Sequence, residues 1–221
     1  MVLFMNYRRN NKRFSVAGRG EYLSTSDFIV KYYTNLDACR KFFFDMKWPT
    51  GYYCEKCGCT HYYFMKSKNC YRCAHCKHDE RLFTNTIFQD NKLPLNVLLY
   101  GLFLIFTSKK GISSLELSEE LKVNYKTACL LQTKARILMK NSNSKKSLDS
   151  SFYESDVAYT GAPSHNGKRG LGTDKQPFLV VLSTEQENKY PLYIKLHEVS
   201  SDSGNIIQAF FDQYVKMSNE R

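Results

Sequence analysis

Two Cys-x-x-Cys pairs carry the clearest chemical signal in this sequence. They are Cys54-Glu-Lys-Cys57 and Cys73-Ala-His-Cys76, and a short tyrosine-rich stretch separates them. Two residues between cysteines let both sulfurs of a tight turn face one ion, and a hairpin of this length can bring two such pairs together as a tetrahedron. The pattern therefore predicts a structural Zn²⁺ site with Cys54, Cys57, Cys73 and Cys76 as ligands. Because four sulfurs leave no open position for water, we expect any catalysis to lie elsewhere.

A disulfide framework and a redox-active Cys-x-x-Cys pair are the alternatives to a zinc site. Residues 1–12 have only a few apolar residues before a basic run, which predicts no secretory signal, and disulfide scaffolds are normally shorter chains. We therefore favour an intracellular zinc ribbon. Five further side chains near the pairs are expected not to bind the metal: Cys59, Cys70, His61, His75 and His78.

Short strands must position the four cysteines. We expect them at Tyr62–Met65, Cys70–Tyr71 and Arg81–Phe83. The aromatic residues of this segment form its small core or, as an alternative, stack on nucleic-acid bases.

A helix is predicted to lead into this module. It runs from Leu36 to Met46 with Thr34 or Asn35 as its N-cap, and Pro49 prevents its continuation. Trp48, the only tryptophan of the chain, is expected to cover the metal site with a large apolar surface.

A helix-turn-helix is predicted after the ribbon. A short helix capped by Ser113 or Ser114 ends at Leu121, and a turn at 122–124 precedes a longer helix, Tyr125–Lys140. In this motif the later helix enters the major groove of DNA. A helical hairpin whose lysines face solvent is the alternative. The residues that we expect to contact DNA are Tyr125, Lys126, Thr127, Lys134 and Arg136 here, and Lys168 and Arg169 in a later basic loop.

The last part of the chain changes from helical to extended patterning. Residues 152–157, 178–182 and 190–199 are predicted to be strands, and a helix follows that begins after Asp202 or Ser203. Three strands and a helix match the opening half of a ribonuclease H-like fold. Asp156 lies on the first strand, where a carboxylate can hold Mg²⁺, or can be a strand aspartate without a ligand role.

The fold class that follows is a multi-module α+β protein. Its expected parts are an N-terminal helical segment (1–47), a zinc ribbon (48–90), a helix-turn-helix-like region with a flexible linker at its end (91–147), and a partial ribonuclease H-like α/β domain (148–221).

Charge and hydropathy indicate the partner. The chain has 221 residues, a formal net charge of +11 and a pI near 9.2, which favour double-stranded DNA; we keep a homo-oligomer open as a further partner. The longest apolar run, Leu95–Phe106, is shorter than the ~20 residues that cross a bilayer. We therefore expect no membrane partner and a cytoplasmic, nucleoid-associated protein of prokaryotic type.

The chain resembles the insertion-sequence transposases that place a zinc ribbon before a ribonuclease H-like catalytic domain of the DDE type. The resemblance runs from about Asp37 to the end of the sequence. It rests on Trp48-Pro49-x-Gly51, Cys54-x-x-Cys57-Gly58, Tyr71-Arg72-Cys73-x-x-Cys76, Thr86-Ile87-Phe88, Lys92-Leu93-Pro94-Leu95 and Lys126-Thr127-Ala128, taken together. It implies DNA cleavage at element ends and strand transfer, by phosphoryl transfer with two divalent ions.

The resemblance gives Asp156 the role of the first catalytic carboxylate. The family has a valine-aspartate-glutamate-threonine-tyrosine pattern here, and Asp156, Tyr159 and Gly161 fit it. Val157 replaces the acidic neighbour, and Ala162 replaces the usual second glycine.

The family's other two catalytic residues come after the last predicted helix, beyond Arg221. We therefore expect a truncated or partial copy that cannot cut or join DNA alone, with Mg²⁺ bound only if the catalytic domain is complete. A non-catalytic DNA-binding regulator, whose C-terminal strands support an oligomer, is the main alternative. An RNA-associated ribbon protein is the third.

Overall fold

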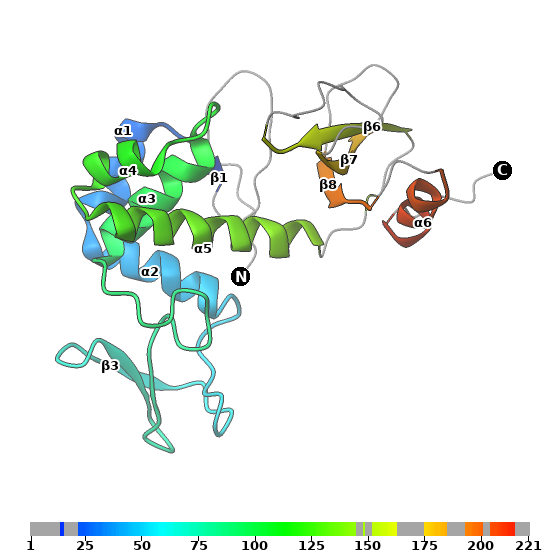
Figure 1. Ribbon diagram of the computed structural model, residues 1–221. Coiled ribbons are helices and arrows are strands. Elements are labelled where there is room, and N and C mark those ends of the chain that lie inside the picture. Colours follow the sequence, from blue (N-terminus) through cyan, green and yellow to red (C-terminus); the bar gives the residue numbers. More distant parts are fainter. Residues whose placement is uncertain are drawn as a thin grey trace. The chain divides into compact units, whose positions relative to one another are not determined.

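The computed structural model describes residues 14–15, 22–144, 148, 152–162, 175–184, 193–200 and 204–214, and it is a mixed α+β fold. The chain divides into two compact units, residues 1–139 and 140–221. Figure 1 shows the elements of both units. Among the helices that the structure describes, none combines the length and the apolar character that a membrane crossing requires.

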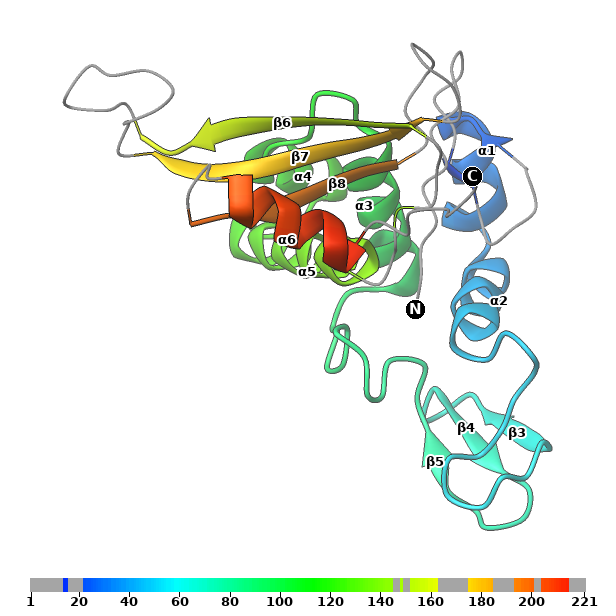
Figure 2. The same ribbon diagram turned by 90° about the vertical axis from the view of Figure 1, so that its right-hand side faces the viewer.

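The first unit joins helices to a small three-stranded sheet. Its elements are β1 (Phe14–Ser15), β2 (Tyr22–Leu23), α1 (Thr25–Phe28), the π-helical turn η1 (Ile29–Tyr33), α2 (Leu36–Lys47), β3 (Tyr62–Met65), β4 (Cys70–Cys73), β5 (Asp79–Glu80), α3 (Leu95–Thr107), α4 (Ser114–Leu121) and α5 (Tyr125–Ser144), which continues into the second unit. Strands β3, β4 and β5 pair antiparallel in that order, as Figure 2 shows.

Side-chain caps explain where the helices begin. The Asn35 carboxamide oxygen accepts hydrogen bonds from the amides of Asp37 and Ala38, so Asn35 rather than Thr34 caps α2. Ser113 accepts from the amide of Glu116 at the start of α4. Asn124 accepts from the amide of Lys126 at the start of α5. These three predicted helix starts are confirmed.

Helices α3, α4 and α5 pack closely because α3 has a glycine at the contact. A Cβ atom on Gly101 would lie 2.6 Å from the Leu131 side chain and 2.8 Å from that of Leu121. The core continues from these helices into α1, where Phe28 stacks on Phe103 with ring centroids 4.1 Å apart. The helices on either side of the turn between α4 and α5 are therefore packed tightly against α3.

The second unit contains three antiparallel strands and a helix. Strands β6 (Phe152–Thr160), β7 (Gln176–Thr184) and β8 (Tyr193–Glu198) pair in that order, and α6 spans Gly204–Tyr214. The core of this unit consists of Leu148, Leu179, Val181, Val199 and Phe210. The predicted strands and helix are confirmed, and the expected helix caps, Asp202 and Ser203, lie outside the described residues.

Two expected boundaries are wrong. The third ribbon strand is Asp79–Glu80, Arg81 has no regular structure, and a turn begins at Leu82. Residues 141–144, expected to belong to a flexible linker, are the last turn of α5. Extending an existing helix costs little once it is nucleated, so asparagine and serine remain helical there despite their modest propensity.

Candidate metal centre and nucleic-acid interface

Four cysteine sulfurs converge at the tip of the ribbon. The Sγ atoms of Cys54, Cys57, Cys73 and Cys76 all lie within 4.8 Å of one another. The Cys54 and Cys76 sulfurs are 3.5 Å apart, as are those of Cys57 and Cys73, and all four are free thiols. A tetrahedral zinc with Zn–S bonds of about 2.3 Å needs sulfurs about 3.8 Å apart. The four residues therefore fit a Zn²⁺ ion.

Backbone hydrogen bonds close the tight turn in each of the two Cys-x-x-Cys knuckles. In the first, the Gly58 amide donates to the Cys54 carbonyl at 2.8 Å, and the Cys54 amide donates to the Cys59 carbonyl at 2.9 Å. Gly58 has φ +71°, a left-handed conformation that glycine adopts without steric cost. In the second, the Cys73 amide donates to the His78 carbonyl at 2.9 Å. The two-residue spacing thus folds each pair into a hydrogen-bonded loop.

The five side chains expected to be non-ligands stay outside this group. Within the described ranges, the only cluster of potential metal ligands contains the four cysteines and none of the following: Cys59, Cys70, His61, His75 and His78. Cys59 directs its sulfur toward the carbonyl of His61, at 3.8 Å.

The four thiols do not ionise equally. Burial opposes ionisation of Cys73, but the amide hydrogens of Cys76 and His75 and the neighbouring thiols lower its pKa to about 6. The amide of Cys59 favours the Cys57 thiolate, yet competition with the thiols of Cys76, Cys73 and Cys54 raises the Cys57 pKa to about 12. Without a metal, one sulfur is ionised at neutral pH while another keeps its proton. Metal binding must therefore displace protons.

An aromatic cluster supports the metal site from α2. Trp48 is 2% exposed, and its ring centroid lies 5.0 Å from that of Tyr52 and 5.3 Å from that of Tyr71. Phe44 of α2 packs on Trp48 at 4.8 Å and on Tyr71 at 5.1 Å. Trp48 thus covers the ribbon as expected, and the helix is part of the same core.

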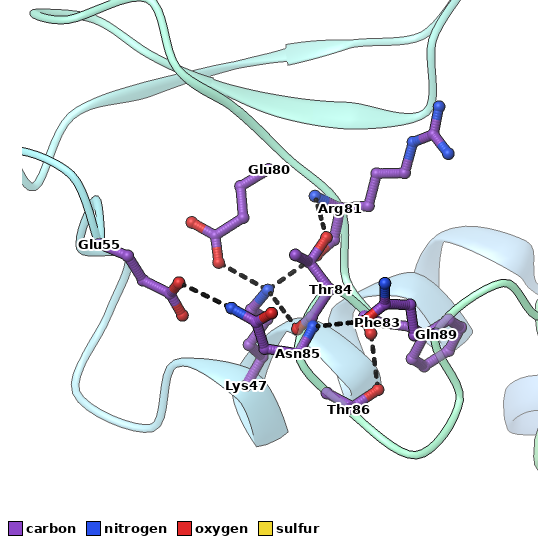
Figure 3. Close-up of polar contacts among 9 residues, drawn as sticks. All are labelled: Lys47, Glu55, Glu80, Arg81, Phe83, Thr84, Asn85, Thr86 and Gln89. Carbon is purple, nitrogen blue, oxygen red and sulfur yellow. Dashed lines mark hydrogen bonds and ion pairs between the residues drawn. The ribbon is translucent and has the colours of Figure 1, made fainter.

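A buried ion pair, which the sequence analysis did not anticipate, locks α2 to the end of the ribbon (Figure 3). The Lys47 ammonium lies 2.6 Å from a carboxylate oxygen of Glu80, and the Glu80 side chain is 0% exposed. Lys47 also donates to the carbonyls of Arg81, at 2.8 Å, and Thr84, at 3.4 Å. The turn that follows β5 is also linked to the first knuckle, because the Asn85 side-chain amide donates a hydrogen bond to the Glu55 carboxylate.

The predicted DNA-contacting residues of α5 differ in their environments. Tyr125 and Lys126 are exposed, and Thr127 is half-buried. Lys134 is half-buried, with its ammonium 5.8 Å from the ring centroid of Phe88. Arg136 is exposed and donates to the Gln132 side chain of its own helix at 3.2 Å. Lys168 and Arg169 lie outside the described residues.

Asp156 is an exposed carboxylate on β6. Its Oδ1 accepts from the Val157 amide at 2.8 Å, and the residues that follow it across the sheet are Val180 and then Leu196. Among the described residues it belongs to no group of three or more potential metal ligands. The part of this unit that the structure describes therefore does not bring together the several carboxylates that a pair of Mg²⁺ ions needs.

Positive charge in residues 91–147 lies on α5 and on the loops around it, whereas α4 carries the three glutamates. Residues 91–147 contain ten lysines and arginines against three glutamates, whereas residues 148–221 contain seven basic and ten acidic residues. Helix α5 itself has four basic residues, Lys126, Lys134, Arg136 and Lys140, and no aspartate or glutamate. This asymmetry directs a polyanion to the helical region.

Comparison with known proteins identifies the ribbon. Residues 35–79 match the family described as transposase zinc-ribbon domain. The matched segment begins at Asn35, the cap of α2, so it covers the helix as well as both knuckles. No curated protein and no solved structure matches the chain. The first half of the chain thus carries a ribbon of the kind found at the N-terminus of insertion-sequence transposases, which associates it with DNA binding.

We expect Cys54→Ser and Cys76→Ser each to lose tightly bound zinc and to unfold the ribbon, because three thiolates bind zinc far more weakly than four. Elemental analysis and near-ultraviolet circular dichroism of the purified variants measure both effects. Cys59→Ser and Cys70→Ser are the matched controls and should keep about one zinc per chain. Full zinc in both Cys54 and Cys76 variants would assign the metal to other ligands.

Zinc affinity should fall as pH falls. At pH 7 Cys73, with a pKa of about 6, is largely ionised, while Cys57, with a pKa of about 12, must release its proton on binding. Below about pH 6 Cys73 is protonated as well, so the decrease should become steeper. Chelator competition between pH 8 and pH 5.5 measures it, and an affinity independent of pH would contradict this account.

Breaking the Lys47–Glu80 pair should destabilise the first unit. Glu80→Ala leaves a buried ammonium without its counter-charge, at an expected cost of about 3–5 kcal/mol in the free energy of unfolding. Replacing both partners, as in Lys47→Met with Glu80→Leu, should restore most of the loss. Asp37→Ala, which removes the exposed partner of Arg40, is the control and should cost at most about 1 kcal/mol. Denaturant unfolding at saturating zinc provides the measurement.

Proposed function

We propose that this chain is an insertion-sequence transposase, or a part of one, and that it binds double-stranded DNA. The observation that carries the proposal is the transposase zinc-ribbon match over residues 35–79, joined to a four-sulfur cluster that fits Zn²⁺. The zinc has a structural role, because the four thiolates fill its coordination sphere. The bound zinc would stabilise the folded ribbon.

The helical region is the main DNA-binding element in this proposal. Residues 51–90 contain six basic and four acidic residues, and four thiolates around one Zn²⁺ add a net charge of about −2, so the ribbon is close to neutral. The excess positive charge lies outside the ribbon: residues 91–147 have ten basic and three acidic residues, and residues 1–47 have nine basic and four acidic residues. Helices α4 and α5, joined by a three-residue turn, supply a helix-turn-helix that can place α5 in the major groove. Lysines and arginines beside it contact phosphates, which gives affinity that falls with salt.

The second unit is proposed to be the opening part of a ribonuclease H-like domain. Its three antiparallel strands followed by a helix support this, and Asp156 on β6 is the candidate first catalytic carboxylate. The four parts 1–47, 48–90, 91–147 and 148–221 remain the proposed domain organisation. Among the described residues, Asp156 is not joined by further carboxylates into a two-ion site, so the proposal for residues 1–221 is limited to DNA binding.

A non-catalytic DNA-binding regulator is the second candidate. The finding that Asp156 belongs to no group of three or more potential metal ligands among the described residues favours it. A divalent-metal-dependent nicking assay with the purified chain tests whether it cleaves DNA. Turnover would show an active transposase and would contradict both the partial transposase and the non-catalytic regulator.

DNA binding is tested with the full chain and duplexes of increasing length. We expect log Kd to rise linearly with log salt, with about 0.9 of slope for each phosphate contacted. Lys126→Ala should weaken binding to all sequences and reduce the slope by about 1. Lys41→Ala, an exposed lysine of α2, is the matched control and should change neither value. Preference for duplex RNA over DNA at fixed salt, or equal losses in the two variants, would contradict the proposal.

A further inference from the structure

Helix α5 buries one face against the rest of its unit. Ala128, Leu131, Gln132 and Ala135 are buried. Their spacing of three and four residues places them on one side of the helix, so the opposite side must face outward. The orientation of α5 is therefore set by packing, and the residues it presents outward follow from that packing.

Gln132 holds this orientation with several hydrogen bonds. Its amide nitrogen donates to the carbonyl of Ile112 at 2.6 Å, and its oxygen accepts from the Ser114 hydroxyl at 3.0 Å. Arg136 donates to the same oxygen at 3.2 Å. A buried polar side chain with satisfied partners fixes one geometry. Rotation of α5 about its axis would break the bonds to Ile112 and Ser114.

The outward ridge of α5 consists of Lys126, Leu130, Thr133 and Ile137. They recur at intervals of four, three and four residues, and all four are exposed. Leu130 is 55% exposed and Ile137 is 42% exposed. The Thr133 hydroxyl donates to the Cys129 carbonyl of its own helix at 2.9 Å, which leaves its methyl group available. Beyond Lys126, the ridge is thus a line of aliphatic groups.

The cations lie at the two ends of this ridge, where Lys126 and Lys140 are exposed, and on its flanks. Lys134 is half-buried beside Phe88, and Arg136 is engaged by Gln132, so neither lies at the centre of the outward face. A helix in the major groove has its flanks beside the phosphates and its outward ridge against the base edges. Aliphatic groups at base edges match the thymine methyl, which is the one apolar group in that groove.

We propose that Leu130, Thr133 and Ile137 read thymine methyl groups in the major groove, while Lys126 and the flanking cations contact phosphates. This inference rests on the proposed DNA binding and goes beyond it by naming the residues that give sequence preference. Charge favours DNA over a second copy of the chain at this ridge. Two copies of α5 would bring together helices with four basic residues each and no acidic residue, whereas phosphates neutralise them.

The test uses DNA that lacks only the methyl group. Duplexes enriched from a random pool by the wild-type chain are prepared with thymine or with uracil, which keeps the same hydrogen-bonding edge. We expect uracil to weaken wild-type binding about fourfold for each methyl contacted, since a buried methyl contributes about 0.8 kcal/mol. In Leu130→Ala and in Ile137→Ala the thymine-to-uracil ratio should fall about fourfold, the effect of one lost methyl contact, with the salt dependence unchanged. Leu115→Ala, a leucine of α4 that is 60% exposed, is the matched control and should keep the wild-type ratio.

The outcomes separate this inference from the proposed function. DNA binding with equal affinity for thymine and uracil duplexes would overturn the inference and leave DNA binding intact. Failure of the wild-type chain to bind any duplex would overturn both. Loss of self-association in Leu130→Ala and Ile137→Ala, measured by sedimentation velocity, with an unchanged thymine-to-uracil ratio, would show that the ridge is a contact between copies of the chain.

Discussion

Four thiol groups packed within 4.8 Å cannot all ionise unless a cation lies between them, and the ribbon depends on that constraint. The unequal acidity of Cys73 and Cys57 expresses the same repulsion in the metal-free chain, because the first thiolate formed is stabilised by the protons that its neighbours keep. A zinc ion replaces those protons with a stronger counter-charge. Strands of two to four residues have too little apolar surface to hold this fold by themselves, so the ion supplies the missing stabilisation.

The ribbon is also bound firmly to the helix that precedes it. Trp48 and Phe44 extend the aromatic core from α2 to Tyr71 of β4, and Lys47 meets Glu80 at the last strand. A buried ion pair adds little net stability compared with an apolar pair, but it permits only one register between the helix and the strand. The family match runs from the cap of α2 to Asp79, one residue before Glu80, so it includes the helix and both knuckles. The helix and the two knuckles therefore form one structural module.

Charge separates this module from the helices that follow. With its metal the ribbon is nearly neutral, while α5 is basic along its length and has no acidic residue. In the proposed complex, long-range attraction to DNA would then come from α5 and not from the nearly neutral ribbon. The hydrogen bonds of Gln132 and the close contact at Gly101 hold α5 in one orientation, as the proposed role in binding a duplex would require.

Local sequence patterns were sufficient to predict most elements and the grouping of the four cysteines. The cysteine spacing specifies a turn of fixed size, and the caps Asn35, Ser113 and Asn124 act on amides only two or three residues away, so neither requires knowledge of the fold. The third ribbon strand, the Lys47–Glu80 pair and the orientation of α5 depend on residues distant in the chain. Lys134, for example, lies beside Phe88, which is 46 positions earlier in the sequence. Helical periodicity predicts that α5 has a buried side. Which residues lie on that side depends on contacts between segments that are distant in the sequence, and these contacts form only in the folded chain.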